Sequence, residues 1–328
     1  MVPEPGTNSM GSFPSSLQLV TAADEAFAMP MAVTLFSVLS NLPPQTEIWI
    51  RALDAGVTAE SKRRIRRVVC RTSPTVHLGW TCPDTSDLEP VELDLDARFS
   101  SAIYYRLLIP EVLPDACSRA LYLDSDLVAE RSILPLWRRS FGDNAALAVP
   151  ERTVSCPKNG VAEWRRLGLD ADAPYFNSGV MLMNLEAWRE QNLHGKTIEY
   201  LLDPENDFCY PGDQEALNAV LAGQWEPLDN RWNAFSFLYK PEPRAESEEM
   251  LGIDLTSARD EPYILHYTSD EKPWQWSCGH PKRDRFYHYL WHSGWFSMPE
   301  YVKWRALLSF RKVKDVTRPY RHRIGLRR

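Results

Sequence analysis

The sequence predicts an α/β fold in which a mostly parallel sheet is flanked by helices. Short apolar runs, typical of buried strands, alternate with segments whose apolar residues recur three and four positions apart, as on one face of a helix. Polar clusters directly follow several of the apolar runs, at the place where parallel sheets bind ligands. With 44% hydrophobic residues in a chain of 328, there is enough apolar material for one large domain or two fused ones.

The first elements alternate strand and helix. The run LQLVTA (17–22) predicts a buried strand, and residues 30–41 predict a helix because proline suits the first helical position. A second strand is expected at 47–53. A basic amphipathic helix is expected over 58–70, with Thr58 as its N-cap.

The rest of the chain continues this alternation. Further strands are expected at 119–123, 145–149, 179–183 and 263–266, and further helices over 101–109, 185–201, 213–222 and 284–292. This order indicates strand–helix–strand units, whose helices cover the faces of a parallel sheet. A ligand site is then expected beyond the carboxyl ends of the strands.

Charge is distributed unevenly along the chain. The net charge is −7, but residues 311–328 carry eight Lys or Arg and one acid, so the chain before them is more acidic still. An acidic body argues against nucleic-acid binding, which depends on Lys and Arg to neutralise phosphates. We expect a disordered N-terminus at 1–16, a catalytic domain at 17–296, and an amphipathic helix with a basic tail at 297–328.

Composition also bears on location. No stretch reaches the roughly 18 to 20 consecutive apolar residues of a spanning helix, and the N-terminus lacks the basic and apolar pattern of a signal peptide. The six cysteines are scattered and form no CxxC pair, which argues against a zinc or redox centre built on cysteine. A cytoplasmic protein is therefore expected.

Three Asp-x-Asp triplets occur, and one of them ends a predicted buried strand. Asp124 and Asp126 end the run ALYLDSD, and because residues two apart in an extended segment face the same way, both carboxylates can bind one hard cation. The triplet at 170–172 lies in a loop-like segment and is expected to be solvated. The triplet at 94–96 is intermediate between these two cases.

His266, which ends the apolar run YILH, is a candidate third ligand. A lone histidine at such a place is often a hydrogen-bonded core residue. Combined with two aspartates, however, an imidazole favours Mn²⁺ over Mg²⁺, because Mg²⁺ prefers oxygen ligands and water. Lys272 follows after a polar turn and would add a positive charge for a phosphate bound to the same cation.

Two further clusters lie at element boundaries. Asn177, Ser178 and Gly179 precede an apolar strand, so the Asn177 amide could bind sugar hydroxyls or simply form a turn with the glycine. Asp213 and Gln214 open a helix, where an acid ordinarily complements the helix dipole.

In order and spacing, five motifs resemble the retaining glycosyltransferases of family 8: AADE, YLDSD, YFNSGVMLMNL, GDQEALN and HYTSDEKPW. The resemblance covers residues 17–276, and five ordered motifs are far more specific than any one of them. The family includes bacterial lipopolysaccharide galactosyl- and glucosyltransferases and the glycogenins. The resemblance implies a GT-A fold of Rossmann-like type, a UDP-sugar donor that is usually UDP-galactose or UDP-glucose, and Mn²⁺, with Mg²⁺ as the alternative ion.

The resemblance also implies a role for each motif. The residues that match the metal ligands are Asp124, Asp126 and His266. The residues that match the catalytic group are Asn177 as the sugar-facing amide, Asp213 and Gln214 at the reaction centre, and Lys272 on the diphosphate. The residues that match the donor site are Ala22 and Asp24 on uracil and ribose, Phe27 on the base, and Arg106, Asp124, Ser125 and Lys272. Ala26 departs from the pattern, because related bacterial enzymes can have a polar residue there.

The implied reaction moves a hexose, galactose or glucose, to a saccharide or glycolipid acceptor. Cleavage of a sugar nucleotide leaves a charged diphosphate, which a divalent cation and Lys272 can stabilise without a proton donor. Retention is compatible with a covalent intermediate and with front-face attack in which the leaving phosphate takes the acceptor's proton.

Three other function classes share parts of the pattern. A phosphatase with an aspartyl nucleophile could also use Asp-x-Asp, but typically at its first strand, whereas Asp124 comes much later in this chain. A sugar-1-phosphate nucleotidylyltransferase would use the same sheet and metal, but it should open with a glycine-rich loop, and AADEAF has no glycine. A catalytically inactive sugar-binding relative would retain Asn177 but could lose metal ligands, and all three candidate ligands are present.

The acceptor site is expected to be built by variable loops such as 154–169 and 235–254, whose residues, among them Trp164 and Tyr239, could bind a sugar or simply cover the core. Residues 300–310 predict an amphipathic helix that leads into the basic tail. This end could pack on the domain and fray in solvent, or dock on an anionic membrane, where each basic residue contributes roughly 1 kcal/mol. Family 8 enzymes with lipid-linked acceptors have similar C-termini, which favours peripheral contact with the inner face of the membrane.

Overall fold

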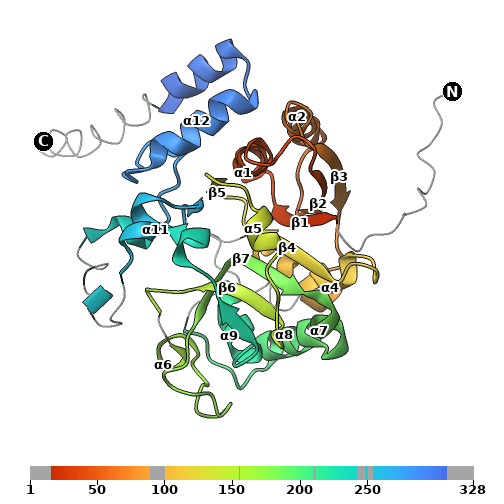
Figure 1. Cartoon of the computed structure of the whole chain (residues 1–328), viewed down its shortest axis with the longest axis vertical. Helices are drawn as coiled ribbons and strands as arrows, with labels where there is room; N and C mark the ends of the chain where they lie inside the picture. Colours follow the sequence, from red (N-terminus) through yellow and green to blue (C-terminus); the bar gives the residue numbers. More distant parts are fainter. Residues whose placement is uncertain are drawn as a thin grey trace, which may run out of the picture.

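The computed structural model describes residues 16–308, except for 89–99, 155, 210–211, 242–244, 246–247 and 250–253. A large mixed sheet runs through the molecule with helices on both sides, and a small second sheet adjoins it (Figure 1). The predicted disordered N-terminus up to residue 15 and the basic tail lie outside the described residues.

The large sheet has the strand order β3-β2-β1-β4-β7-β6-β8. Its strands are β1 (Leu17–Ala23), β2 (Glu47–Asp54), β3 (Thr75–Thr81), β4 (Arg119–Leu123), β6 (Ala146–Pro150), β7 (Phe176–Asn184) and β8 (Trp225–Pro227). All neighbouring pairs are parallel except the two that β7 forms with β4 and β6. The predicted α/β class with a mostly parallel sheet is therefore confirmed.

The small sheet has the order β5-β10-β9, with β5 (Leu127–Ala129), β10 (Ile264–His266) and β9 (Ala234–Phe235). Sequence patterns predicted β10 but missed β5 and β9, and they also missed β3 and β8 in the large sheet. These four strands are short or, like β3, only half-buried, so they lack the long apolar run that identifies a central strand.

The α-helices are α1 (Ala28–Ser40), α2 (Ala59–Val69), α4 (Ile109–Val112), α5 (Leu134–Trp137), α6 (Pro157–Gly160), α7 (Leu185–Glu190), α8 (Leu193–Leu202), α9 (Gln214–Val220), α11 (Thr256–Asp260) and α12 (Arg283–Ser293). The 3₁₀ segments are η1 (Ser86–Leu88), η2 (Ser101–Leu108), η3 (Asn230–Asn233) and η4 (Ser236–Tyr239). The predicted cap of α2 is confirmed, since the Thr58 side chain accepts from Ser61 N.

Two predicted helices need correction. The single helix expected over 185–201 is two helices, α7 and α8, because Asn192 between them takes the left-handed conformation at φ 52°, which asparagine tolerates better than most residues. The helix expected over 101–109 is mainly 3₁₀, with a short α-helix following it.

Alternate residues of the central strands face opposite helical layers, since side chains along a strand point to alternate sides. On β7, Val180 and Leu182 belong to the core shared with α1 and α2. Met181 and Met183 belong to the core shared with α7, α8 and α9. Burial on both faces explains the continuous apolar run of this strand.

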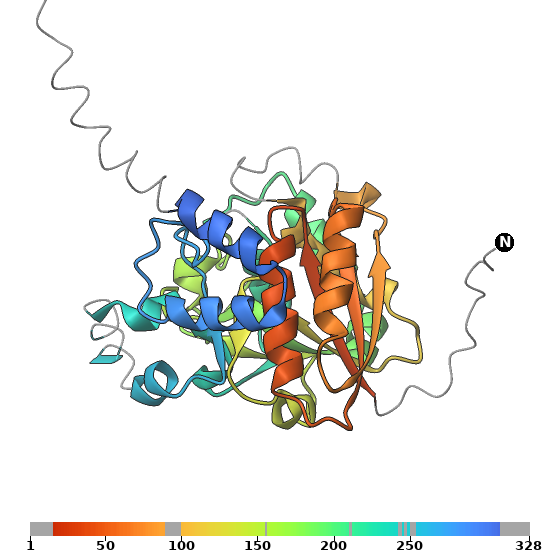
Figure 2. The same cartoon turned by 90° about the horizontal axis from the view of Figure 1, so that it is seen from above.

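The last described segment, 298–308, is helical and lies beside α12 (Figure 2). Trp291 of α12 packs against Tyr301, and Arg64 of α2 pairs with Glu300 at 2.9 Å. The predicted helix therefore begins earlier than expected and is attached to the domain. Within the described part of the chain, no helix combines the length and hydropathy needed to cross a bilayer.

Candidate active site

The three predicted cation ligands meet where the two sheets join. β4 ends at Leu123 and β5 begins at Leu127, so the chain carries Asp124 and Asp126 from the large sheet into the small one. His266 is the last residue of β10 and pairs with Leu127 in antiparallel register. Pairing of β10 with β5 thus delivers the imidazole to the two carboxylates.

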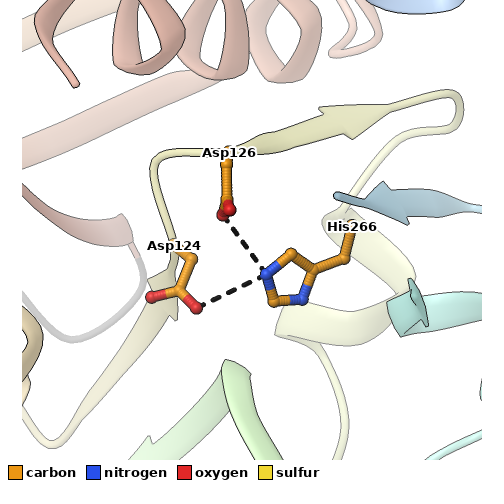
Figure 3. A group of neighbouring side chains, drawn as sticks. All are labelled: Asp124, Asp126 and His266. Atoms are coloured by element: carbon orange, nitrogen blue, oxygen red, sulfur yellow. Dashed lines mark ion pairs between the residues drawn. The ribbon is translucent and has the colours of Figure 1, made fainter. Parts of the chain in front are cut away.

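His266 Nε2 lies 3.5 Å from Asp124 Oδ2 and 3.2 Å from Asp126 Oδ1 (Figure 3). One potential ligand atom from each residue lies within 4.8 Å of the others, as expected of a group that can hold a metal ion. Asp126 and His266 are buried, whereas Asp124 is half-buried. The cluster therefore reaches solvent on the Asp124 side.

Gly179 of β7 leaves the room that this cluster needs. Its carbonyl accepts from Asp124 N at 2.9 Å, so the two backbones run side by side. A Cβ at position 179 would overlap His266 Cε1 and lie 2.6 Å from Asp124 Oδ2. The donor set and the space beside it fit a divalent cation held by two carboxylates and one imidazole.

Replacing Gly179 with alanine is expected to weaken Mn²⁺ binding at least about tenfold, because the added methyl group displaces two ligands at once. Free Mn²⁺ measured by electron paramagnetic resonance during titration reports the affinity. Gly279→Ala is a matched control, since a Cβ there meets only Glu271 Oε2 at 3.9 Å. Equal affinity of Gly179→Ala and the unmodified protein would contradict the placement of these ligands.

Lys272 stands next to the same cluster. Its Nζ donates to Asp126 Oδ2 and to Tyr267 O, both at 2.7 Å. Burial alone would raise the pKa of Asp126, but the ammonium charge of Lys272 and the hydrogen bonds with Lys272 and His266 hold that pKa well below its usual value. Asp126 is therefore ionised at neutral pH, with an ammonium group beside it.

Arg106 connects the cluster to the GDQ motif. The buried guanidinium pairs with Asp124 Oδ1 at 3.1 Å and with Asp213 Oδ2 at 2.8 Å. It also donates to Ser178 O at 2.7 Å and lies 4.5 Å from the centre of the Tyr122 ring. Burial acts to lower the pKa of Arg106, but the adjacent carboxylates raise it overall, so the group remains charged. In this structure Arg106 orients both acids.

Asp213 precedes α9 but makes no capping hydrogen bond through its side chain, which turns to Arg106 instead. The Asp213 side chain is therefore held by an ion pair and not by a capping hydrogen bond at the helix start. Burial raises the pKa of Asp213 to about 6, although Arg106 acts in the opposite direction. A buried carboxyl with a displaced pKa beside a cation site is typical of functional sites.

Asp213→Asn is expected to stabilise the ligand-free fold at pH 8 and to change it little near pH 4. The folded protein holds the Asp213 proton more tightly than the unfolded chain does. The stability that this proton contributes is therefore fully present below pH 3.8, the pKa in the unfolded chain, and is lost as the pH rises through about 6, the pKa in the folded protein. Asparagine resembles the neutral acid, and the gain at pH 8 is up to roughly 3 kcal/mol. Urea unfolding at both pH values measures it, with the exposed Asp172→Asn as control; no gain at pH 8 would contradict the shifted pKa.

Asn177 and Gln214 lie side by side next to these charges. Asn177 Nδ2 donates to Gln214 Oε1 at 3.1 Å, and Ser178 N donates to the same oxygen at 3.2 Å. Gln214 is half-buried, whereas Asn177 is buried. The two amides predicted to face the sugar thus form one polar group adjoining Asp213.

Of the predicted donor-binding residues, Ala22, Asp24, Asp124 and Ser125 lie at the ends of β1 and β4, which are neighbours in the sheet. The Ser125 hydroxyl donates to Ala22 O, so its donor capacity is used within the protein. Asp24 Oδ1 accepts from Phe27 N at 3.0 Å. The Phe27 ring packs on Trp274 with centroids 5.6 Å apart, so the segment that follows the first motif contacts the last motif.

Two buried residues of this site were missed by sequence reasoning. Glu151 follows β6, and Asn233 ends η3; they bond to Asn177 and His266. A carboxylate two residues after the predicted strand 145–149 was the one available signal for Glu151. Asn233 lies in no motif, since its partners come from distant parts of the chain.

Other predicted features lie apart from the cluster. The triplet at 94–96 and part of the second acceptor loop are outside the described residues. Asp172 of the third triplet is exposed and pairs with Lys158, as expected for a solvated loop. A cavity of about 260 Å³ is bordered by Tyr239 and Arg259, and none of the predicted cation or donor residues lines it.

Comparison with known proteins identifies the family. A family model described as glycosyl transferase family 8 matches residues 18–278. General stress protein A of Bacillus subtilis is 29% identical over 282 residues, covering 85% of this chain and 94% of the relative. A lipopolysaccharide 1,2-glucosyltransferase of Escherichia coli is 30% identical over 280 residues, covering 84% of this chain and 78% of the relative.

A solved structure supports the same conclusion at the level of the fold. The crystal structure of the galactosyltransferase LgtC in complex with donor and acceptor sugar analogues superposes with a TM-score of 0.70 at 24% sequence identity, covering 88% of this chain and 99% of that chain. The fold is therefore GT-A, as predicted. Together with the family match over most of the chain, this establishes that the chain belongs to glycosyl transferase family 8 and is a glycosyltransferase.

Proposed function

We propose that this glycosyltransferase moves galactose or glucose from a UDP-sugar to a saccharide or lipid-linked saccharide acceptor, with retention of configuration and dependence on Mn²⁺. The convergence of Asp124, Asp126 and His266 beside Lys272 carries the proposal. The similarity to a lipopolysaccharide 1,2-glucosyltransferase supports a hexose donor and an acceptor of the lipopolysaccharide class.

The charges around the cluster suit a departing diphosphate. When bound at this site, Mn²⁺ supplies Lewis acidity and positive charge to the phosphate oxygens. Lys272 adds an ammonium group, which exchanges its contact with Asp126 for one with phosphate. No side chain has to protonate the leaving group, because its charge is stabilised electrostatically.

The opposite side of the cluster suits the sugar. Arg106 holds Asp213 in place through the 2.8 Å ion pair, while Asn177 positions Gln214. A carboxylate and an amide oxygen near the anomeric carbon stabilise positive charge that develops as the bond to the diphosphate breaks. In this proposal Ala22, Asp24 and Phe27 bind the nucleoside.

A donor panel tests the proposal. The purified protein is incubated with UDP-glucose, UDP-galactose, UDP-N-acetylglucosamine and GDP-mannose in Mn²⁺, Mg²⁺ or chelator, and release of the nucleotide and transfer to oligosaccharide acceptors are measured. We expect turnover of a UDP-hexose in Mn²⁺, its loss in chelator and its recovery when Mn²⁺ is restored. Equal turnover in chelator, or preference for GDP-mannose, would count against the proposal.

As a second part of the proposal, the C-terminal end of the chain makes peripheral contact with the membrane. Met298, Val302 and Leu307 of the final described helix have exposed fractions of 59%, 59% and 56%, and Trp291 of α12 is 44% exposed. The basic residues of 311–328 follow this helix in the sequence. Apolar side chains beside a run of cations are typical of helices that bind anionic lipid surfaces.

Removing residues 311–328 is expected to abolish co-sedimentation with liposomes that contain anionic phospholipid. The binding should also weaken with added salt, because the attraction is electrostatic. Neutral phosphatidylcholine liposomes are the control. Equal pelleting of the full chain and the shortened chain with anionic liposomes would exclude this role for the tail.

A further inference from the structure

Beyond the residues already assigned, a chain of hydrogen bonds runs from Glu151 through Asn177 and Asn233 to His266. Glu151 Oε2 accepts from Asn177 Nδ2 at 3.0 Å, and Asn177 Oδ1 accepts from Asn233 Nδ2 at 2.8 Å. Asn233 Oδ1 lies 2.9 Å from His266 Nδ1. Asn233 is fully buried, and the other side chains are nearly so.

Glu151 determines which group donates and which accepts in each hydrogen bond of this network. An ionised carboxylate only accepts hydrogen bonds, and its Oε1 already receives Arg152 N, Thr153 N and the Thr153 hydroxyl. Its Oε2 must therefore face a donor, which is the NH₂ group of Asn177. The Asn177 oxygen also accepts from Gly179 N at 3.1 Å, which fixes the same orientation independently.

The orientation of Asn177 in turn determines which nitrogen of the His266 imidazole carries a proton. Because Asn177 presents its oxygen to Asn233, Asn233 must present its NH₂ group there and its own oxygen to His266. That oxygen can only accept, so His266 Nδ1 carries a proton. The other ring nitrogen, Nε2, faces Asp124 and Asp126 at 3.5 and 3.2 Å.

We propose that Glu151, Asn177 and Asn233 are positioning residues that hold the His266 ring as a donor at Nδ1, so that Nε2, which contacts the two carboxylates in the ligand-free protein, is the nitrogen that gives its lone pair to the divalent cation when the cation binds. Hydrogen bonds to the distal nitrogen of a metal-bound histidine fix its orientation and tautomer. The inference rests on the cation site of the proposed function. Because Asn177 also donates to Gln214, the same hydrogen-bond network couples the cation ligand to Gln214 at the proposed reaction centre.

Three variants each test a different hydrogen bond of this network. Asn233→Ala removes the acceptor for Nδ1, and we expect Mn²⁺ affinity to fall about 10-fold to 100-fold. Asn233→Asp keeps an acceptor for Nδ1 but presents a second oxygen to Asn177 Oδ1, so Mn²⁺ affinity should be largely retained while KM for the donor rises. Glu151→Gln places its NH₂ group toward Asn177, because three donors occupy the other side, and Mn²⁺ affinity should fall again.

A matched control is Asn206→Ala. Asn206 is also buried, but its side chain bonds to Tyr200 O and to Arg166 and takes no part in the network from Glu151 to His266. Circular dichroism and thermal unfolding verify that each variant folds. Mn²⁺ affinity equal to that of the unmodified protein in Asn233→Ala, with the fold intact, would overturn the proposal.

A second readout requires neither activity nor bound Mn²⁺. Two-bond ¹H–¹⁵N spectra of ¹⁵N-histidine-labelled protein show which ring nitrogen carries a proton, and His266→Gln assigns the signal. We expect a protonated Nδ1 in the unmodified protein and in Asn233→Asp, and its loss or exchange broadening in Asn233→Ala. An unprotonated Nδ1 in the unmodified protein would overturn the inference, whereas absence of Mn²⁺ binding alongside a protonated Nδ1 would contradict only the proposed cation.

Discussion

Turnover of Asp126→Asn is expected to fall by more than about 10³-fold, the largest effect of any single substitution in this site. Asp126 is buried, ionised, and placed between His266 Nε2 and Lys272 Nζ at 3.2 and 2.7 Å. Asparagine retains the shape but presents one neutral oxygen and one NH₂ group, so it weakens the cation site and leaves Lys272 without its carboxylate. Steady-state turnover with a UDP-hexose, measured at limiting and at saturating Mn²⁺, tests this expectation.

The chain offers a matched control in its third Asp-x-Asp triplet. Asp172→Asn makes the same chemical change at a side chain that is 76% exposed and paired with Lys158. Its turnover and its Mn²⁺ requirement should remain those of the unmodified protein. Unchanged activity of Asp126→Asn at limiting Mn²⁺ would refute the assignment of Asp126 as a ligand.

Lys272→Ala is expected to lower turnover by about 10²-fold to 10³-fold with a smaller change in Mn²⁺ affinity, because the ammonium stabilises charge that develops on the leaving diphosphate. Its present contacts, Asp126 Oδ2 and Tyr267 O, place Nζ beside the cation cluster. Lys272→Arg retains the charge in a different shape and should recover part of the loss.

Lys196→Ala is the control for this substitution, since Lys196 is exposed on α8 and belongs to none of the predicted binding segments. The informative measurement is the split between kcat and KM for the donor. A rise in KM with kcat unchanged would show that Lys272 binds substrate and transition state equally, which would contradict a role in bond cleavage.

Sequence patterns predicted those features that neighbouring residues encode. The central strands β1, β4 and β7 are continuous apolar runs because both of their faces are buried, and such runs are visible without a structure. The cap at Thr58 is equally local. The break at Asn192 was missed because the apolar spacing of α7 continues into α8, and only the backbone conformation of one residue interrupts it.

The site divides in the same way. Asp124 and Asp126 could be selected from one strand end, and His266 from another, because each follows an apolar run. No sequence pattern predicts the ion pairs of Arg106 with Asp124 and Asp213. These pairs join a 3₁₀ segment to a strand end and to a helix start, which are far apart in the sequence.

By itself, then, the order of residues determined the α/β class and the residue types available for chemistry, because periodicity and motifs are properties of adjacent positions. Tertiary structure alone decided how the small sheet meets the large one, and with it the approach of His266 to the two aspartates. It also decided that Asn233 and Glu151 stand behind those ligands. These contacts depend on strand order and on the buried space left by Gly179, which arise from packing between distant segments.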